Sequence, residues 1–175
     1  MEIWDLLDES RNPVGKTHTR GTPMQPGCYH LAVEIWTVNS KGEVLLTLRA
    51  PEKKKFPNLW ENTAGSVLAG ESSIEGAVRE LGEETGIHLS NSDFHYLGSC
   101  MEETAFVDSY LVRSDLEREA LTLQPGETVD AQWVSFERLE QMIYSGEVAE
   151  PIGLRYAYAK ETLMRQLNQR TKKSF

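Results

Sequence analysis

The pattern of apolar and polar residues along the chain predicts a mixture of strands and helices. Tyr29–Val38 (YHLAVEIWTV) is rich in β-branched and aromatic side chains, which is typical of a strand. The turn-forming residues 39–42 follow, and we expect Glu43–Leu48 (EVLLTL) to return as the hairpin partner. Further strands are expected at Phe94–Cys100, Phe106–Val112 and Thr128–Val134.

The N-terminal region is less apolar. Glu2–Leu7 is expected to form an edge strand or one arm of a hairpin, followed by a turn at Asn12–Gly15. Residues 16–27 contain glycine, two prolines and several polar residues, so we expect a loop there. The segment Arg49–Trp60 (RAPEKKKFPNLW) is also expected to be a loop, and it has a local excess of positive charge.

Three segments carry helical signals. Ser72 and Glu75 form a capping box, and Gly86 is the residue expected just past the helix end. Two more helices are expected, at Phe136–Tyr144 and at Leu154–Asn168. Strands before and after one central helix, with helices at the end of the chain, predict an α+β fold with a mixed sheet between helical layers.

The length and charge of the chain limit its organisation and its partners. Its 175 residues fit one domain, with an N-terminal extension at 1–28, a core at 29–135 and C-terminal helices at 136–175. The 27 acidic and 18 basic residues give a net charge of −9, which argues against long nucleic acid or a membrane surface as a partner. Cys28 and Cys100 are too few for a disulfide framework and are expected to be buried. The N-terminus does not have the pattern of a signal peptide, and the expected location is the cytoplasm.

The central helix carries an unusual group of acidic residues. Its apolar residues fall on one stripe that must face the core, namely Ile74, Ala77, Val78 and Leu81. Glu80, Glu83 and Glu84 lie beside this stripe, at a rim that is neither deeply buried nor outermost. Like charges in one turn repel, so these residues form either a solvated face or the ligands of a hard divalent cation. Arg79 is placed to pair with a carboxylate, and Gly76 leaves room for a ligand or a neighbouring backbone.

The spacing around this helix favours the cation. Gly65 is followed after five residues by Glu71, and after seven more by Arg79, which begins the sequence RELGEETGI. This spacing resembles the Nudix box at every specified position. The resemblance implies an α/β/α sandwich and a hydrolase with Mg²⁺ or Mn²⁺ as its cofactor. Such an enzyme cleaves a diphosphate bond in a nucleoside diphosphate-linked or related small-molecule substrate, by attack of a metal-activated water.

The resemblance also implies roles for particular residues. Glu80, Glu83 and Glu84 correspond to the metal ligands, beside a backbone carbonyl near Ala64 or Gly65. Arg79 corresponds to the residue that orients these carboxylates. The structural positions of the motif are Gly65, Glu71 and Gly86.

Some members of the family have a further glutamate in a loop before a late strand. Glu127, six residues before Trp133, matches this position, so it is either a metal ligand or general base, or a plain surface residue. Glu102 and Glu103 are further candidates for the same role.

Substrate contacts are expected from the basic loop, because a positive patch beside a metal site favours polyanions. The candidates are Arg49, Lys53, Lys54 and Lys55, and for the lysines the alternative is a solvated loop. Trp60 is a candidate for stacking on a base, as are Trp36, Phe56 and Phe106, and the alternative for these aromatic residues is packing in the core.

A second resemblance covers residues 29–87. Tyr29–Trp36 and Leu59–Asn62, among other segments, are similar to isopentenyl-diphosphate isomerase, another enzyme of this fold. That enzyme needs a catalytic Cys and a metal-binding His in the next loop, which here reads Thr63–Leu68 and contains neither. His30 matches one of its metal ligands. An isomerase-like enzyme and a non-catalytic nucleotide-binding sensor are therefore the alternatives to the hydrolase.

Two segments bear on the oligomeric state. The Ile3–Leu7 edge and the last helix pack either on the chain's own sheet or on a second copy in a homodimer. The apolar residues of that helix are Leu154, Tyr158, Leu163 and Leu167.

Overall fold

The computed structural model describes residues 1–171, which form nine strands and three α-helices. The strands are β1 (Ile3–Leu7), β2 (Pro13–Thr19), β3 (His30–Val38), β4 (Glu43–Arg49), β5 (Trp60–Glu61), β6 (Thr63–Ser66), β7 (His95–Met101), β8 (Ala105–Arg113) and β9 (Thr128–Ser135). The helices are α1 (Ser73–Thr85), α2 (Phe136–Ser145) and α3 (Glu150–Thr171). The end of the expected region 136–175, beyond Thr171, lies outside the described residues.

Strand β3 lies at the centre of a mixed sheet of seven strands. It runs parallel to β8 along its whole length, from His30 opposite Ala105 to Val38 opposite Arg113. Its other edge is shared, because β6 pairs with Ala32–Ile35 and β4 meets it only at Val38. The predicted hairpin of β3 and β4 is therefore limited to one residue pair, since β4 pairs mainly with β9.

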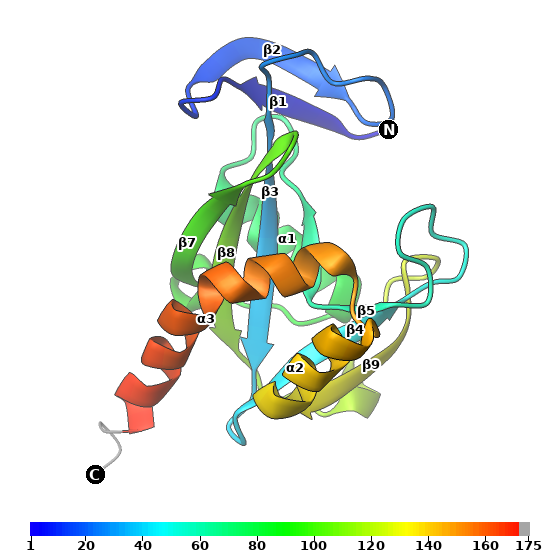
Figure 1. Ribbon diagram of the computed structural model, residues 1–175, viewed down its shortest axis with the longest axis vertical. Helices are drawn as coiled ribbons and strands as arrows, with labels where there is room; N and C mark the ends of the chain where they lie inside the picture. Colours follow the sequence, from blue (N-terminus) through cyan, green and yellow to red (C-terminus); the bar gives the residue numbers. More distant parts are fainter. Residues whose placement is uncertain (172–175) are drawn as a thin grey trace.

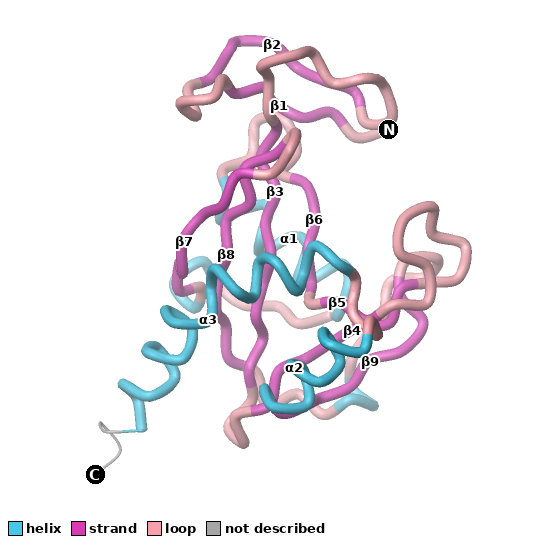
Figure 2. The backbone as a smooth tube through the Cα atoms, in the orientation of Figure 1, coloured by secondary structure: helices cyan, strands magenta, loops and turns pink. Residues whose placement is uncertain are grey.

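Helices cover both faces of this sheet, α1 on one face and α2 with α3 on the other (Figure 1, Figure 2). Trp36 is fully buried on the side of α2 and α3, in contact with a cluster that includes Met142 and Ile152. Its neighbour Ile35 belongs to the cluster on the α1 side, with Leu81. Successive residues of a strand point to opposite faces, so β3 contributes to both cores. The predicted α/β/α sandwich with a mixed sheet is confirmed.

The predicted helices are present. Helix α1 has Ser72 as its N-cap, a capping box with Glu75, and Gly86 in the left-handed conformation (φ 72°) after its last turn. Helix α3 begins at Glu150, before the predicted start at Leu154, because Pro151 is tolerated in a first turn where the backbone N–H has no helical partner. Within residues 1–171, none of the helices is long and apolar enough to cross a membrane.

The N-terminal extension differs from the prediction. Residues 16–27 were expected to be a loop, but strand β2 occupies Pro13–Thr19 and pairs with β1 as a hairpin above the sandwich (Figure 1). The turn also lies earlier than Asn12–Gly15. It spans residues 9–11 and is closed by a hydrogen bond of 2.9 Å from the N–H of Asp8 to the carbonyl of Asn12. Only one side chain of β2, that of His18, is buried, so the strand lacks the apolar alternation that would have predicted it.

The two segments that bear on the oligomeric state pack on this chain, at least in part. In β1, Leu7 pairs with Tyr29 of the same chain, and β2 covers its other edge. Leu163 of α3 is fully buried in the core, whereas Leu154 and Tyr158 are exposed.

Candidate active site

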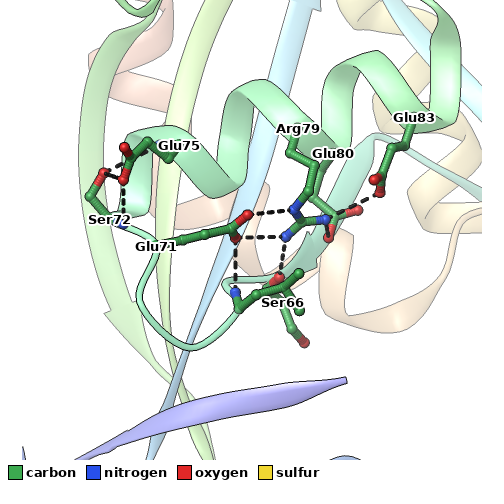
Figure 3. A network of polar contacts seen from close by, with 8 residues as sticks. Ser66, Glu71, Ser72, Glu75, Arg79, Glu80 and Glu83 are labelled. Atoms are coloured by element: carbon green, nitrogen blue, oxygen red, sulfur yellow. Dashed lines mark hydrogen bonds and ion pairs between the residues drawn. The ribbon is translucent and has the colours of Figure 1, made fainter. Parts of the chain in front are cut away.

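Arg79 lies at the centre of a polar network that connects helix α1 to the preceding strand (Figure 3). Its Nε and Nη2 donate to the two carboxylate oxygens of Glu71 at 2.8 and 3.0 Å, and Nη2 also donates to the carbonyl of Ser66 at 2.9 Å. Its Nη1 donates to Glu80 at 2.8 Å and to Glu83 at 3.2 Å. The hydrogen bond to Glu71 raises the pKa of Arg79 and lowers the pKa of Glu71. One guanidinium therefore fixes two of the three helix glutamates.

Strand β6 approaches α1 so closely that Gly65 has no room for a side chain. A Cβ atom at Gly65 would lie 2.0 Å from Cδ of Glu80. At Gly76, a Cβ atom would lie 2.9 Å from Cγ2 of Val67. The space at this glycine is therefore filled by Val67, in the segment just after β6, and not by a ligand. Gly65 thus leaves room for the carboxylate of Glu80, and Gly76 lets helix α1 pack closely against Val67.

The three helix glutamates lie at different depths. Glu83 is exposed, with 48% of its side-chain surface accessible, and Glu80 retains 13%. Glu84 is buried, which corrects the expected position at a rim, and its Oε2 has no hydrogen-bond partner among the described residues. Burial raises the pKa of Glu84 well above its ordinary value, and the negative charges of Glu61, Glu80 and Glu127 raise this pKa further. The positive charge of Arg49 opposes this rise, but it is the smallest of these effects. Glu84 is therefore a buried carboxyl group with one oxygen that no donor of the described chain reaches.

Glu61 of β5 is an acidic residue near Glu84 that the sequence pattern did not indicate. It is buried, and it accepts two hydrogen bonds from Arg49 Nη1, at 2.6 and 2.7 Å. Nε of Arg49 donates to the carbonyl of Lys55 at 3.1 Å, and no residue of the described chain accepts a hydrogen bond from Nη2. The position of Glu61 directly after Trp60, in the segment similar to the isomerase, was the only signal in the sequence.

A cavity of about 300 Å³ brings most of the expected residues together. Its lining includes Arg49, Lys53, Ala64, Gly65, Arg79, Glu80, Glu83, Glu84 and Glu127. Glu127 enters it from the loop before β9 and forms an ion pair with Lys53. The N–H of Ala50 donates to the carbonyl of Glu127 at 2.8 Å, which fixes this loop beside the basic segment. Glu127 therefore lies in the cavity with the helix glutamates, and its role as a metal ligand or general base stays a prediction.

Other expected residues lie outside this cavity. Glu102 is ion-paired with Arg155 at 2.6 Å, and both residues line a neighbouring cavity that also contains Lys55. Glu103 is exposed at the end of β7. His30 stacks on Trp4, with ring centroids 4.0 Å apart, and burial lowers its pKa.

The aromatic candidates are mostly part of the core. Trp36 and Phe106 are buried. Trp60 and Phe56 are half-buried and pack against the core cluster on the side of α2 and α3. Only Phe56 among these four lines one of the cavities near Arg49. The core alternative therefore describes Trp36, Phe106 and Trp60 better than base stacking does.

The donor set fits a hard divalent cation. Carboxylate and carbonyl oxygens are the ligands that Mg²⁺ and Mn²⁺ prefer. Glu84 supplies a buried oxygen without a partner, and Gly65 leaves space around Glu80. Across residues 1–171, no three His, Cys, Asp or Glu side chains are yet gathered at the spacing of a metal site, and Arg79 holds Glu80 and Glu83. A cation would therefore have to draw these carboxylates together.

The fold and this site define the class of the protein, a mixed α/β/α sandwich whose central helix and preceding strand supply an acidic site. The NUDIX domain family matches residues 29–152. The chain therefore belongs to the Nudix family and is a Nudix hydrolase, with relatives among the isopentenyl-diphosphate isomerases.

Three proteins illustrate these relations. An uncharacterised Nudix hydrolase of Listeria monocytogenes is 41% identical over 148 residues, which cover 84% of this chain and 88% of the relative. The isopentenyl-diphosphate Delta-isomerase of Paenarthrobacter aurescens is 30% identical over 77% of this chain and 76% of its own. A crystal structure from Deinococcus radiodurans matches with a TM-score of 0.72 and 27% identity, over 85% of this chain and 92% of that one. Both resemblances seen in the sequence are thus confirmed at the level of the family.

Proposed function

We propose that this chain hydrolyses a diphosphate bond in a nucleoside diphosphate-linked or related small molecule, with Mg²⁺ or Mn²⁺ as its cofactor. The observation that carries the proposal is the buried carboxylate of Glu84, whose Oε2 has no partner in the described chain and which faces other negative charges. Ionising a buried carboxyl group is costly, and a bound cation offsets that cost. The ligands in this proposal are Glu80, Glu83, Glu84 and the carbonyl near Ala64, with Glu127 as a further candidate.

The bound cation would neutralise charge on the phosphates and activate a water molecule. The chain's own groups position the reactants. Arg79 holds Glu80 and Glu83, and Glu80 or Glu127 accepts a hydrogen bond or a proton from the attacking water. Arg49 directs its Nη2 to a substrate phosphate, because Glu61 and Lys55 already occupy its other donors. Lys55 lines the neighbouring cavities and not the acidic one, so it is a candidate for contact with a phosphate further along the substrate.

The isomerase alternative lacks its catalytic group. The loop that follows β5 contains neither Cys nor His, and Cys100 lies on β7, away from the cavity with the glutamates. A thiol that should protonate or deprotonate an allylic diphosphate must reach the substrate, so the hydrolase is the better supported activity.

The test measures cleavage of the diphosphate bond in nucleoside di- and triphosphates, nucleotide sugars and dinucleotides, with Mg²⁺ or Mn²⁺, by separating the monophosphate products from the substrate. The native protein is compared with Glu83→Gln and Glu84→Gln. Glu161→Gln, an exposed helix glutamate of α3, is the matched control and should retain native turnover. We expect at least one compound to be hydrolysed, with a loss of about 100-fold or more in the two α1 variants.

Two outcomes would contradict the proposal. One is that no compound of a broad panel is hydrolysed although nucleotides bind equally well to all variants, which would favour the sensor. The other is that isopentenyl diphosphate is isomerised while no diphosphate is cleaved.

A further inference from the structure

A second, larger cavity opens beside the acidic site. Its volume is about 920 Å³, and it lies between the N-terminal hairpin and the body of the domain. Five residues line both this cavity and the one that contains the helix glutamates, namely Arg20, Arg49, Lys53, Ser66 and Glu127. The two cavities therefore adjoin, and the larger one lies within reach of a molecule whose diphosphate is bound at the acidic site.

The hairpin wall of this cavity is held firmly on the domain. Trp4 of β1 stacks on His30 of β3 at 4.0 Å and also on His18 of β2 at 5.7 Å. The carbonyl of Ile3 accepts a hydrogen bond from the N–H of Ala69 at 2.8 Å, just before the acidic helix. A wall fixed in this way can select among substrates, because it does not need to be ordered when the substrate binds.

The lining carries an excess of positive charge in a chain whose net charge is −9. The cations are Arg20, Arg49, Lys53, Lys54 and Lys55, and the acidic residues are Glu52 and Glu127. Arg20, Arg49 and Lys53 form ion pairs with glutamates. Lys54 and Lys55 form none with any residue of the described chain. Two unpaired lysines in a cavity beside a phosphate site favour an additional anionic group on the substrate.

The lining is unsuitable for an apolar tail. Its large apolar side chains are Trp4 and Met24, and Trp4 is 9% exposed because histidines cover its ring. The hydroxyls of Thr22, Ser66 and Thr104 contribute hydrogen-bonding groups instead. The volume lies within the usual range for a whole small-molecule ligand. A polar group of nucleoside size therefore fits this cavity better than an isoprenoid chain.

We propose that this cavity binds the part of the substrate beyond the scissile diphosphate, and that this part carries a phosphate monoester. This inference rests on the proposed hydrolase function and specifies its substrate class: dinucleotide-like molecules with a third phosphate remote from the bond that is cleaved. Lys54 and Lys55 bind that third phosphate, and the hairpin residues form the opposite wall.

The experiment uses two matched pairs of compounds that each differ by one phosphate monoester, NADH with NADPH and dephospho-coenzyme A with coenzyme A. Values of kcat and KM are measured for the native protein and for the double variant Lys54→Gln with Lys55→Gln. We expect kcat/KM to be about tenfold higher for the phosphorylated member of at least one pair. The double variant should lose this preference mainly through KM. Lys41→Gln, in the exposed turn at the far end of β3, is the matched control and should keep the preference.

The inference and the proposed function fail in different ways. If the chain hydrolyses diphosphates but treats both members of each pair alike, or if the double variant keeps the native preference, only the inference is overturned. If nothing is hydrolysed, the proposed function is overturned, and the binding of NADH and NADPH is then compared by nicotinamide fluorescence with Mg²⁺ present. Tighter binding of NADPH that disappears in the double variant would support the cavity assignment. Equal binding of the two, or no binding, would overturn it.

Discussion

At position 65, a hydrogen atom is all that fits between strand β6 and the carboxylate of Glu80. Gly65→Ala would place a methyl group 2.0 Å from Cδ of Glu80 and would force that side chain out of the cavity. Because a displacement of about 1 Å at a catalytic group can cost about 100-fold in rate, we expect a loss of this size in kcat/KM. Gly82→Ala is the control in the same helix, since the one close contact of its methyl group would be with the exposed side chain of His88, at 3.0 Å, and the carbonyl oxygen of Ile87 would lie at an ordinary 3.9 Å. A Gly65→Ala enzyme with native turnover would contradict this role of Glu80.

Arg79 illustrates why the geometry of the guanidinium matters as well as its charge. Arg79→Lys keeps the charge but removes the planar fork that reaches Glu71, Ser66 and Glu80 together. We expect kcat to fall about 10- to 100-fold with a smaller change in KM, because the carboxylates are misplaced and the cavity remains. Arg165→Lys, at an exposed ion pair of α3, should leave the steady-state kinetics unchanged. Equal effects of the two substitutions would show that Arg79 does not position the site.

At the scale of elements, an ion pair at the turn of the N-terminal hairpin connects this turn to the central sheet. Arg11 adopts the left-handed conformation (φ 66°), and its Nη2 donates to the buried carboxylate of Asp108 on β8 at 2.5 Å. Ser73, the first residue of α1, donates to the same oxygen at 2.6 Å. Arg11→Ala would leave Asp108 buried without its cation, at a cost of about 1–3 kcal/mol.

We therefore expect Arg11→Ala to increase hydrogen exchange in β1 and β2 more than in β3 and β8, and to raise KM for the substrate. Combining it with Asp108→Asn should recover part of the lost stability, because the buried charge is then removed as well. Arg118→Ala, which breaks an exposed ion pair with Asp130, is the control. Uniform exchange across the whole domain would contradict a local role for Arg11.

The elements that the sequence predicted are those with local signals. Helix α1 has a capping box at Ser72 and a glycine at its end, and β3 has a long apolar run, so both were placed correctly. Strands β5 and β6 have two and four residues, too short for any periodicity to appear. Strand β2 was missed because its pairing with β1, and not apolar side chains, holds it in place.

At the scale of the whole molecule, the site combines residues from the basic loop after β4, from β6, from α1 and from the loop before β9. The spacing of the box identified Glu80, Glu83 and Glu84, but it did not predict that Glu84 is buried. Nor did it predict that Glu61 of β5 and Glu127 of the loop before β9 lie near enough to raise the pKa of Glu84. Helical periodicity describes one helix alone, so it cannot show which of its charges other elements will cover.

The buried carboxyl groups couple metal binding to the stability of the fold. Glu84 has a pKa raised well above 4.5, so between 4.5 and that raised value the native state binds more protons than the unfolded chain. The free energy of unfolding in EDTA should therefore fall as the pH rises above 4.5. Glu34, Glu61 and Glu80 also have raised pKa values, each chiefly because of burial, and they act in the same direction.

A cation held by Glu84 would offset this loss. At pH 8, we expect Mg²⁺ at about 100 times its dissociation constant to add about 3 kcal/mol, seen as a rise in Tm of about 5–10 °C. At pH 5, the same Mg²⁺ concentration should give a smaller rise, because protons compete with the cation for the carboxylates. Glu84→Gln should reduce both the pH slope and the Mg²⁺ effect. Glu34→Gln separates the pH slope from the Mg²⁺ effect. Glu34 is buried on β3, where it accepts hydrogen bonds from Ser109 and Trp36, and it lies outside the acidic cavity. It should reduce the pH slope and leave the Mg²⁺ shift intact. If Glu84→Gln kept the full Mg²⁺ shift, the buried carboxylate would not be a metal ligand.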